Sequence, residues 1–115
     1  MLEFKNKLPF IEETNLHDII RVCQTPFYVY SQKMITQKVE ETKKVLGGNI
    51  FFSIKSNSNQ AILKLMQSLN IGADVVSIGE LKRSLSAGFH PNKIIFEGVG
   101  KSKEDLIYAI QKIYV

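Results

Sequence analysis

The feature that most constrains the fold is an alternation of apolar runs and amphipathic segments from residue 50 onward. The apolar runs predict buried strands over residues 50–54, 73–77 and 93–97. Helical spacing of apolar side chains predicts helices over residues 60–69, 79–87 and 103–112. Because parallel strands need long crossover connections, this order indicates an α/β fold with right-handed crossovers. Periodicity alone fits either an open doubly wound sheet or part of a barrel.

Three more elements are predicted before this alternation begins. A short helix over residues 15–23 has Asn15 as its N-cap, a strand follows over 27–30, and a longer helix covers 32–46. Gly47-Gly48 ends that last helix. At the other end, residues 113–115 are expected to open one more strand.

Charge and cysteine content exclude several classes of protein. The 15 Lys+Arg and 11 Asp+Glu give a net charge of +4, and the basic residues are scattered, so no nucleic-acid surface is predicted. No apolar run reaches the ~18 residues of a membrane span. Cys23 is the single cysteine and lies on the apolar face of its helix, which indicates core packing and a reducing, cytoplasmic location. His17 and His90 are isolated, so no metal site is predicted.

Lys55 is the first candidate for chemistry because it directly follows an apolar strand. The carboxyl ends of strands carry the active sites of α/β folds. Partial desolvation there would keep some of the amine neutral, and a neutral amine condenses with aldehydes. The alternative is a solvated lysine that begins a loop.

Asp74 is the second candidate because it lies within the apolar run over residues 73–77. A buried carboxylate needs partners, since burying it unpaired is costly. One interpretation is a site acid near Lys55, and the other is an aspartate paired with backbone N–H groups at the strand edge. Ser77 with Glu80, and Ser102 with Asp105, have the spacing of helix capping boxes and are assigned structural roles.

Several segments, in this order along the chain, resemble the diaminopimelate decarboxylases. The resemblance runs from about residue 8 to the end of the chain. Its clearest part is Phe52-Ser53-Ile54-Lys55-Ser56-Asn57-Ser58-Asn59, which is similar to the pyridoxal-phosphate lysine motif of that family. The other similar segments are residues 25–30, 73–81, 87–91 and 95–102.

The resemblance implies a pyridoxal-phosphate TIM-type (β/α)₈ barrel followed by a β-domain, in homodimers with shared active sites. It implies decarboxylation of meso-diaminopimelate to L-lysine and carbon dioxide, with Lys55 as the Schiff-base lysine and Asp74 near the cofactor. A complete barrel needs about 250 residues, so residues 1–115 are expected to form a single, truncated partial domain. Residues 1–31 would be its entry helix and strand, and residues 32–115 its first βα units.

Other functions stay open from the sequence. The family's phosphate-binding loop, its histidine that stacks on the cofactor ring, and its β-domain have no counterpart here, so we expect no turnover by these 115 residues without a downstream polypeptide. The chain is alternatively a non-catalytic remnant or a small α/β interaction module. Within the family, arginine, ornithine or a related diamino acid is the alternative substrate.

Overall fold

The parallel sheet expected from the alternating pattern is present in the second half of the chain. The computed structural model describes residues 2–113. The chain divides into two compact units, with the boundary between Lys44 and Val45. In the second unit, the strands β4 (Phe51–Ser53), β5 (Gly72–Val75) and β6 (Ile94–Phe96) pair in parallel in the order β4-β5-β6.

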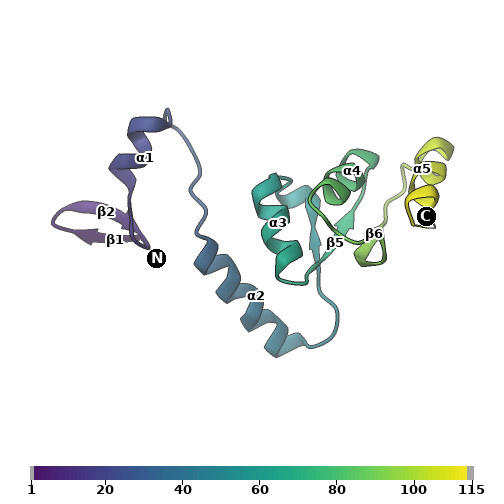
Figure 1. Cartoon of the computed structure of the whole chain (residues 1–115), viewed down its shortest axis with the longest axis horizontal. Helices are drawn as coiled ribbons and strands as arrows, with labels where there is room; N and C mark the ends of the chain where they lie inside the picture. The colour runs from purple at the N-terminus through teal and green to yellow at the C-terminus, as the bar shows by residue number, and fades with distance from the viewer. Residues whose placement is uncertain (1, 114–115) are drawn as a thin grey trace. The chain divides into compact units, whose positions relative to one another are not determined.

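The strand order places both connecting helices on one face of this sheet. Helix α3 (Gln60–Ser68) connects β4 to β5, and α4 (Ile78–Ser86) connects β5 to β6 (Figure 1). Successive crossovers that advance in the same direction with the same right hand return on the same side. A doubly wound sheet reverses its strand order only at its centre, so three strands in sequence order fit a barrel wall or one half of such a sheet. The predicted parallel βα units are confirmed.

The core of this unit lies between the sheet and those helices. In β5, Ala73 and Val75 have no exposed surface, whereas Asp74 between them is partly exposed. Since neighbouring residues of a strand face opposite sides, the helices cover the face of Ala73 and Val75. Fully or nearly buried apolar side chains complete this core: Ile54, Leu63, Met66, Ile71, Leu81, Ala87, Phe89 and Ala109.

Side-chain caps fix where the helices begin. The Ser77 hydroxyl accepts from the Glu80 amide at 3.2 Å at the start of α4. Before α5 (Lys103–Ile113), the Ser102 hydroxyl accepts from the Asp105 amide at 3.1 Å, and the Asp105 carboxylate accepts from the Ser102 amide at 3.0 Å. The predicted capping box is complete at Ser102 and Asp105, whereas at α4 only the Ser77 half of the box is formed.

The first unit begins with an antiparallel meander that the sequence analysis missed. Its strands β1 (Leu2–Lys5), β2 (Leu8–Ile11) and β3 (Thr14–Asn15) pair in sequence order. Asn6 and Lys7, which connect β1 to β2, both have positive φ angles of 52° and 65°. Two such residues form the tight hairpin turns that match the twist of the flanking strands.

Two predictions in this unit are wrong. Asn15 does cap α1 (Leu16–Val22), accepting from the His17 amide at 3.0 Å, but Cys23 after it is exposed rather than packed in a core. Residues 27–30 form no strand, and the Tyr28 side chain is 89% exposed. Aromatic and β-branched content describes a fit to a pleated surface, and no strand among residues 2–113 pairs with this segment.

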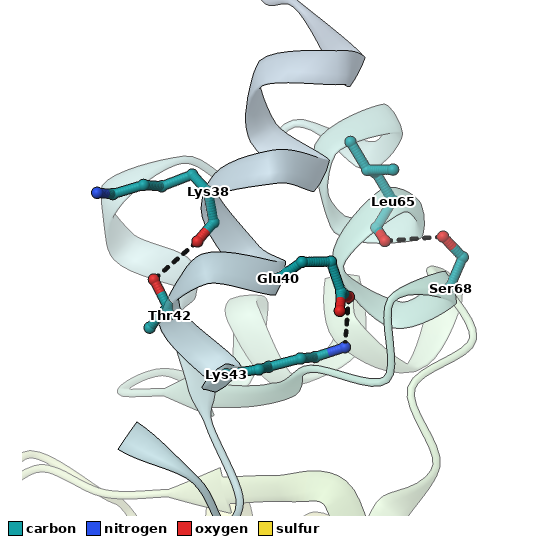
Figure 2. A network of polar contacts seen from close by, with 6 residues as sticks. All are labelled: Lys38, Glu40, Thr42, Lys43, Leu65 and Ser68. Atoms are coloured by element: carbon teal, nitrogen blue, oxygen red, sulfur yellow. Dashed lines mark hydrogen bonds and ion pairs between the residues drawn. The ribbon is translucent and has the colours of Figure 1, made fainter. Parts of the chain in front are cut away.

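Helix α2 (Gln32–Leu46) follows and has the bounds that the sequence predicts. It buries none of its described side chains. Figure 2 shows how hydroxyl groups bond within their own helices: Thr42 donates to the Lys38 carbonyl in α2, and Ser68 donates to the Leu65 carbonyl in α3, each at 2.8 Å. Each bond joins two residues of the same helix, so neither fixes the helix against another element.

The far end of the chain differs from its prediction. Ile113, expected to open a strand, is the last residue of α5, and residues 114–115 lie outside the described part of the structure. Among residues 2–113, no helix combines the length and apolarity that crossing a bilayer requires.

A substitution at Gly72 tests the close packing of β5 against its neighbours in the sheet. A Cβ atom built there would lie 2.3 Å from the Phe51 ring and 2.9 Å from the Lys93 carbonyl oxygen. We expect Gly72→Ala to lower the free energy of unfolding by about 1–3 kcal/mol through overpacking, measured by urea denaturation. Gly100→Ala is the matched control, since a Cβ there meets nothing within 4 Å. Equal stability of the two variants would contradict this packing.

Candidate functional site

The candidate site lies at the carboxyl ends of β4 and β5. Strand β4 ends at Ser53 and is followed by a single 3₁₀ turn, η1 (Ile54–Ser56), with Lys55 at its centre. Ile54 has no exposed surface and anchors this turn in the core. The Ser56 hydroxyl donates to the Ser53 carbonyl at 2.7 Å, which closes the turn.

Lys55 is exposed in the structure. The strand was predicted to run through residue 54, with Lys55 partly desolvated at its end. That expectation of desolvation is wrong, because the chain leaves the sheet one residue earlier and the turn brings Lys55 to the surface. No hydrogen bond or ion pair involves its amine among residues 2–113, so the amine is available to a ligand.

Asp74 lies beside Ser53 across the β4–β5 ladder. The two residues are register partners in the parallel pairing, and partners in register project from the same face of a sheet. This face is opposite to that of Ala73 and Val75, which the helices cover. Asp74 therefore projects from the face that the helices leave uncovered, together with Ser53 and at the same level.

Both of these side chains carry a buried polar atom without a partner. Ser53 Oγ and Asp74 Oδ1 are inaccessible and make no hydrogen bond to any described residue. In the described residues, no backbone N–H group therefore bonds this aspartate oxygen, unlike in the second interpretation of Asp74. Unsatisfied buried polar atoms are uncommon because each costs about 1–3 kcal/mol. A hydroxyl donor and a carboxylate acceptor, side by side, can together hold a polar group of a ligand.

Helix α4 fixes the end of the strand that carries Asp74. The Glu80 carboxylate accepts from the Val76 amide at 3.0 Å, while Ser77 caps the same helix. The predicted structural role of Glu80 is confirmed, although its carboxylate bonds one residue before the N-cap. Asp74 thus lies two residues before an amide that the helix holds and three residues before the helix N-cap.

The remaining candidates do not join this site. His17 and His90 are both exposed. No group of three or more metal-binding side chains occurs in the described chain. Ser53 was the functional candidate that the sequence analysis missed. Its position two residues before Lys55 was visible, but its neighbour in the next strand depends on register, which the local sequence does not fix.

Comparison with known proteins identifies the family. The family model for the pyridoxal-binding domain of pyridoxal-dependent decarboxylases matches residues 32–114. The chain belongs to the pyridoxal-dependent decarboxylase family. It is 38% identical over 113 residues to a diaminopimelate decarboxylase from Zymomonas mobilis. This alignment covers 93% of this chain and 27% of the relative. It is 44% identical over 90 residues to the diaminopimelate decarboxylase from Campylobacter jejuni, covering 76% of this chain and 22% of the relative.

A solved decarboxylase structure has the same fold over most of the chain. The diaminopimelate decarboxylase from Helicobacter pylori, in complex with L-lysine, aligns with a TM-score of 0.79 and 38% identity. This alignment covers 86% of this chain and 26% of the other. The chain therefore spans about a quarter of the length of the relatives that it matches.

The residues at this edge fit the cofactor of the family. Pyridoxal phosphate carries an aldehyde, for which an unpaired amine is the matching nucleophile. It also carries polar ring substituents, which a hydroxyl and a carboxylate can bind. Lys55, Ser53 and Asp74 supply these three groups, and Ser53 and Asp74 each have a buried oxygen without a partner among residues 2–113.

Ser53 and Ser84 provide a matched test of the unsatisfied hydroxyl. Ser84 is fully buried, and its hydroxyl donates to the Glu80 carbonyl at 2.9 Å. Ser84→Ala should lower the free energy of unfolding by about 0.5–1.5 kcal/mol, whereas Ser53→Ala should raise it by about 1 kcal/mol because an unsatisfied group is removed. Both are measured by urea denaturation without ligand. A loss of stability in Ser53→Ala would show that this hydroxyl has a partner in the folded chain.

Proposed function

We propose that this chain forms the first part of the cofactor barrel of a decarboxylase that acts on meso-diaminopimelate. Lys55 would hold pyridoxal phosphate covalently, and Asp74 would face it. The observation that carries the proposal is the buried Asp74 Oδ1, which has no partner among the described residues and lies beside Ser53, two residues before the exposed Lys55. The family match over residues 32–114 supports it.

The proposed roles follow from the chemistry of each side chain. The bound cofactor would supply an electron-withdrawing ring for the electrons released when carbon dioxide leaves. Lys55 would attach the cofactor through its amine and later exchange it for the substrate amine. Asp74, as a carboxylate, would accept a hydrogen bond from a nitrogen near that attachment point. Ser53 would donate its hydroxyl hydrogen to an oxygen of the ligand.

The choice of substrate rests on similarity. Both curated relatives described above are named diaminopimelate decarboxylases. Solved ornithine and arginine decarboxylases also align, each at 26% identity, with TM-scores of 0.76 and 0.75. We favour meso-diaminopimelate because of the higher identity, and ornithine and arginine remain the alternative substrates.

Assembly and location are proposed on the same basis. We propose that residues 1–31 lead into a barrel whose first βα units are residues 32–115, and that a further polypeptide segment completes it. The described residues supply three parallel strands, whereas a closed barrel has eight. A homodimer and a cytoplasmic location remain predictions.

Selective labelling of Lys55 tests the proposed attachment site. The purified chain is incubated with limiting pyridoxal phosphate, reduced with borohydride and mapped by peptide mass spectrometry. We expect Lys55 to carry at least about tenfold more label than Lys64, which corresponds to about 1.4 kcal/mol. Lys64 is the matched control, since it is also exposed and its amine makes no hydrogen bond or ion pair to residues 2–113.

The pattern of labelling decides between the functions. Lys55→Ala should abolish the dominant label, and Lys64→Ala should leave it unchanged. Label spread evenly over the 13 lysines of the chain would overturn the proposal and favour a non-catalytic remnant or an interaction module.

Complementation tests the proposed activity. We expect no carbon dioxide from meso-diaminopimelate and pyridoxal phosphate with this chain alone, because three strands cannot enclose the cofactor. Release should begin when a polypeptide that carries the remaining barrel of a related decarboxylase is added, and Lys55→Ala should stop it. Turnover by the chain alone that Lys55→Ala removes would refute the need for a completing segment.

A further inference from the structure

Two hydrogen bonds connect α4 to the segment that follows Lys55. Arg83 Nη1 donates to the Ser58 carbonyl oxygen at 3.2 Å, and Gln60 Nε2 donates to the Arg83 carbonyl oxygen at 3.1 Å. The donors lie on opposite sides of the contact, one on α4 and one at the start of α3. The pair therefore forms a reciprocal connection across more than twenty residues of chain, which we call the Arg83–Gln60 latch.

The segment after Lys55 has few other long-range polar contacts. Its remaining recorded hydrogen bonds are local, such as those from the Asn57 amide to the Ile54 carbonyl at 3.1 Å and from the Asn59 amide to the Asn57 side chain at 3.0 Å. Local bonds define the shape of a turn but not its position relative to the next strand. Within the described residues, the hydrogen bond from Arg83 to the Ser58 carbonyl connects this segment to another helix, α4.

The same helix is also attached to the strand that carries Asp74. Glu80 holds the Val76 amide at 3.0 Å, and Arg83 follows Glu80 by three residues, which places both on one side of the helix. Helix α4 thus bonds to the end of β5 through Glu80 and to the segment after β4 through Arg83. It is a rigid connection between the two strand ends of the candidate site.

We propose that Arg83 is a positioning residue that sets where Lys55 lies relative to Asp74, with Gln60 as its reciprocal partner. This inference rests on the proposed attachment of pyridoxal phosphate to Lys55. The guanidinium is suited to the task because its planar fork loses less freedom on bonding than an ammonium on a flexible stem. Loss of the latch loosens the segment that follows the turn, while Ile54 stays in the core, so that the amine and the carboxylate meet a ligand together less often.

The first measurement needs no cofactor. Hydrogen–deuterium exchange of the purified 115-residue chain is compared for wild type, Arg83→Gln, Arg83→Lys and Gln60→Ala. Arg83→Gln should speed exchange of the amides of residues 57–60 at least about tenfold while leaving the β5 amides unchanged, because only a local opening is made easier. Arg83→Lys should restore part of the protection, and Gln60→Ala should have a smaller effect in the same direction.

The second measurement is the label on Lys55 after borohydride reduction with pyridoxal phosphate. Arg83→Gln should lower it about tenfold without changing the label on Lys64, and Arg83→Lys should recover part of it. Arg21→Gln is the matched control, because the other arginine of the chain forms an exposed ion pair with Asp18 at 3.7 Å and no polar contact with the segment after Lys55 among residues 2–113. It should leave both measurements at the wild-type level.

The two measurements separate this inference from the proposed function. If wild type labels Lys55 selectively and Arg83→Gln does so equally well, the positioning role is overturned while the attachment site stands. If exchange over residues 57–60 is unchanged in Arg83→Gln, the latch itself is overturned. If wild type shows no selective label, the proposed function fails, and with it the role of Arg83 in positioning Lys55 for the cofactor.

Discussion

The parallel pairing of β4 with β5 is the interaction on which the candidate site depends. It sets Ser53 opposite Asp74 and leaves the polar atoms of both buried without partners. The pairing requires Gly72, because the Phe51 ring and the Lys93 carbonyl occupy the space that a Cβ atom would need. A residue with no apparent chemistry therefore allows the strand contact that brings the chemical groups together.

Helix α4 connects the ends of these two strands to each other. Its first turn is bonded to the end of β5 through Ser77 and Glu80, and its last turn is bonded to the segment after β4 through Arg83. The buried Leu81 faces the core between these polar contacts. Packing and hydrogen bonding on one helix thus determine the spacing of two strand ends, which is the usual way in which a βα scaffold positions residues on its loops.

The sequence predicted the βα units well because their signals are local. Apolar runs marked the three strands, and capping residues marked the starts of α4 and α5 within one or two positions. The meander at residues 2–15 was missed. Its turn residues, Asn6 and Lys7, have positive φ angles, which only the structure shows. Residues 27–30 have the composition of a strand but no partner within residues 2–113. In both cases strand formation depended on pairing, which composition does not report.

The sequence alone determined the α/β class, the position of Lys55 after a strand, and the helix caps, because each depends on residues within one turn or one strand of each other. The tertiary structure decided which face carries Asp74, that Ser53 is its neighbour, that Lys55 is exposed, and that Arg83 reaches Ser58. These features depend on register and strand order, which join residues about twenty positions apart. They are fixed by ladders and packing that form only when the whole unit folds.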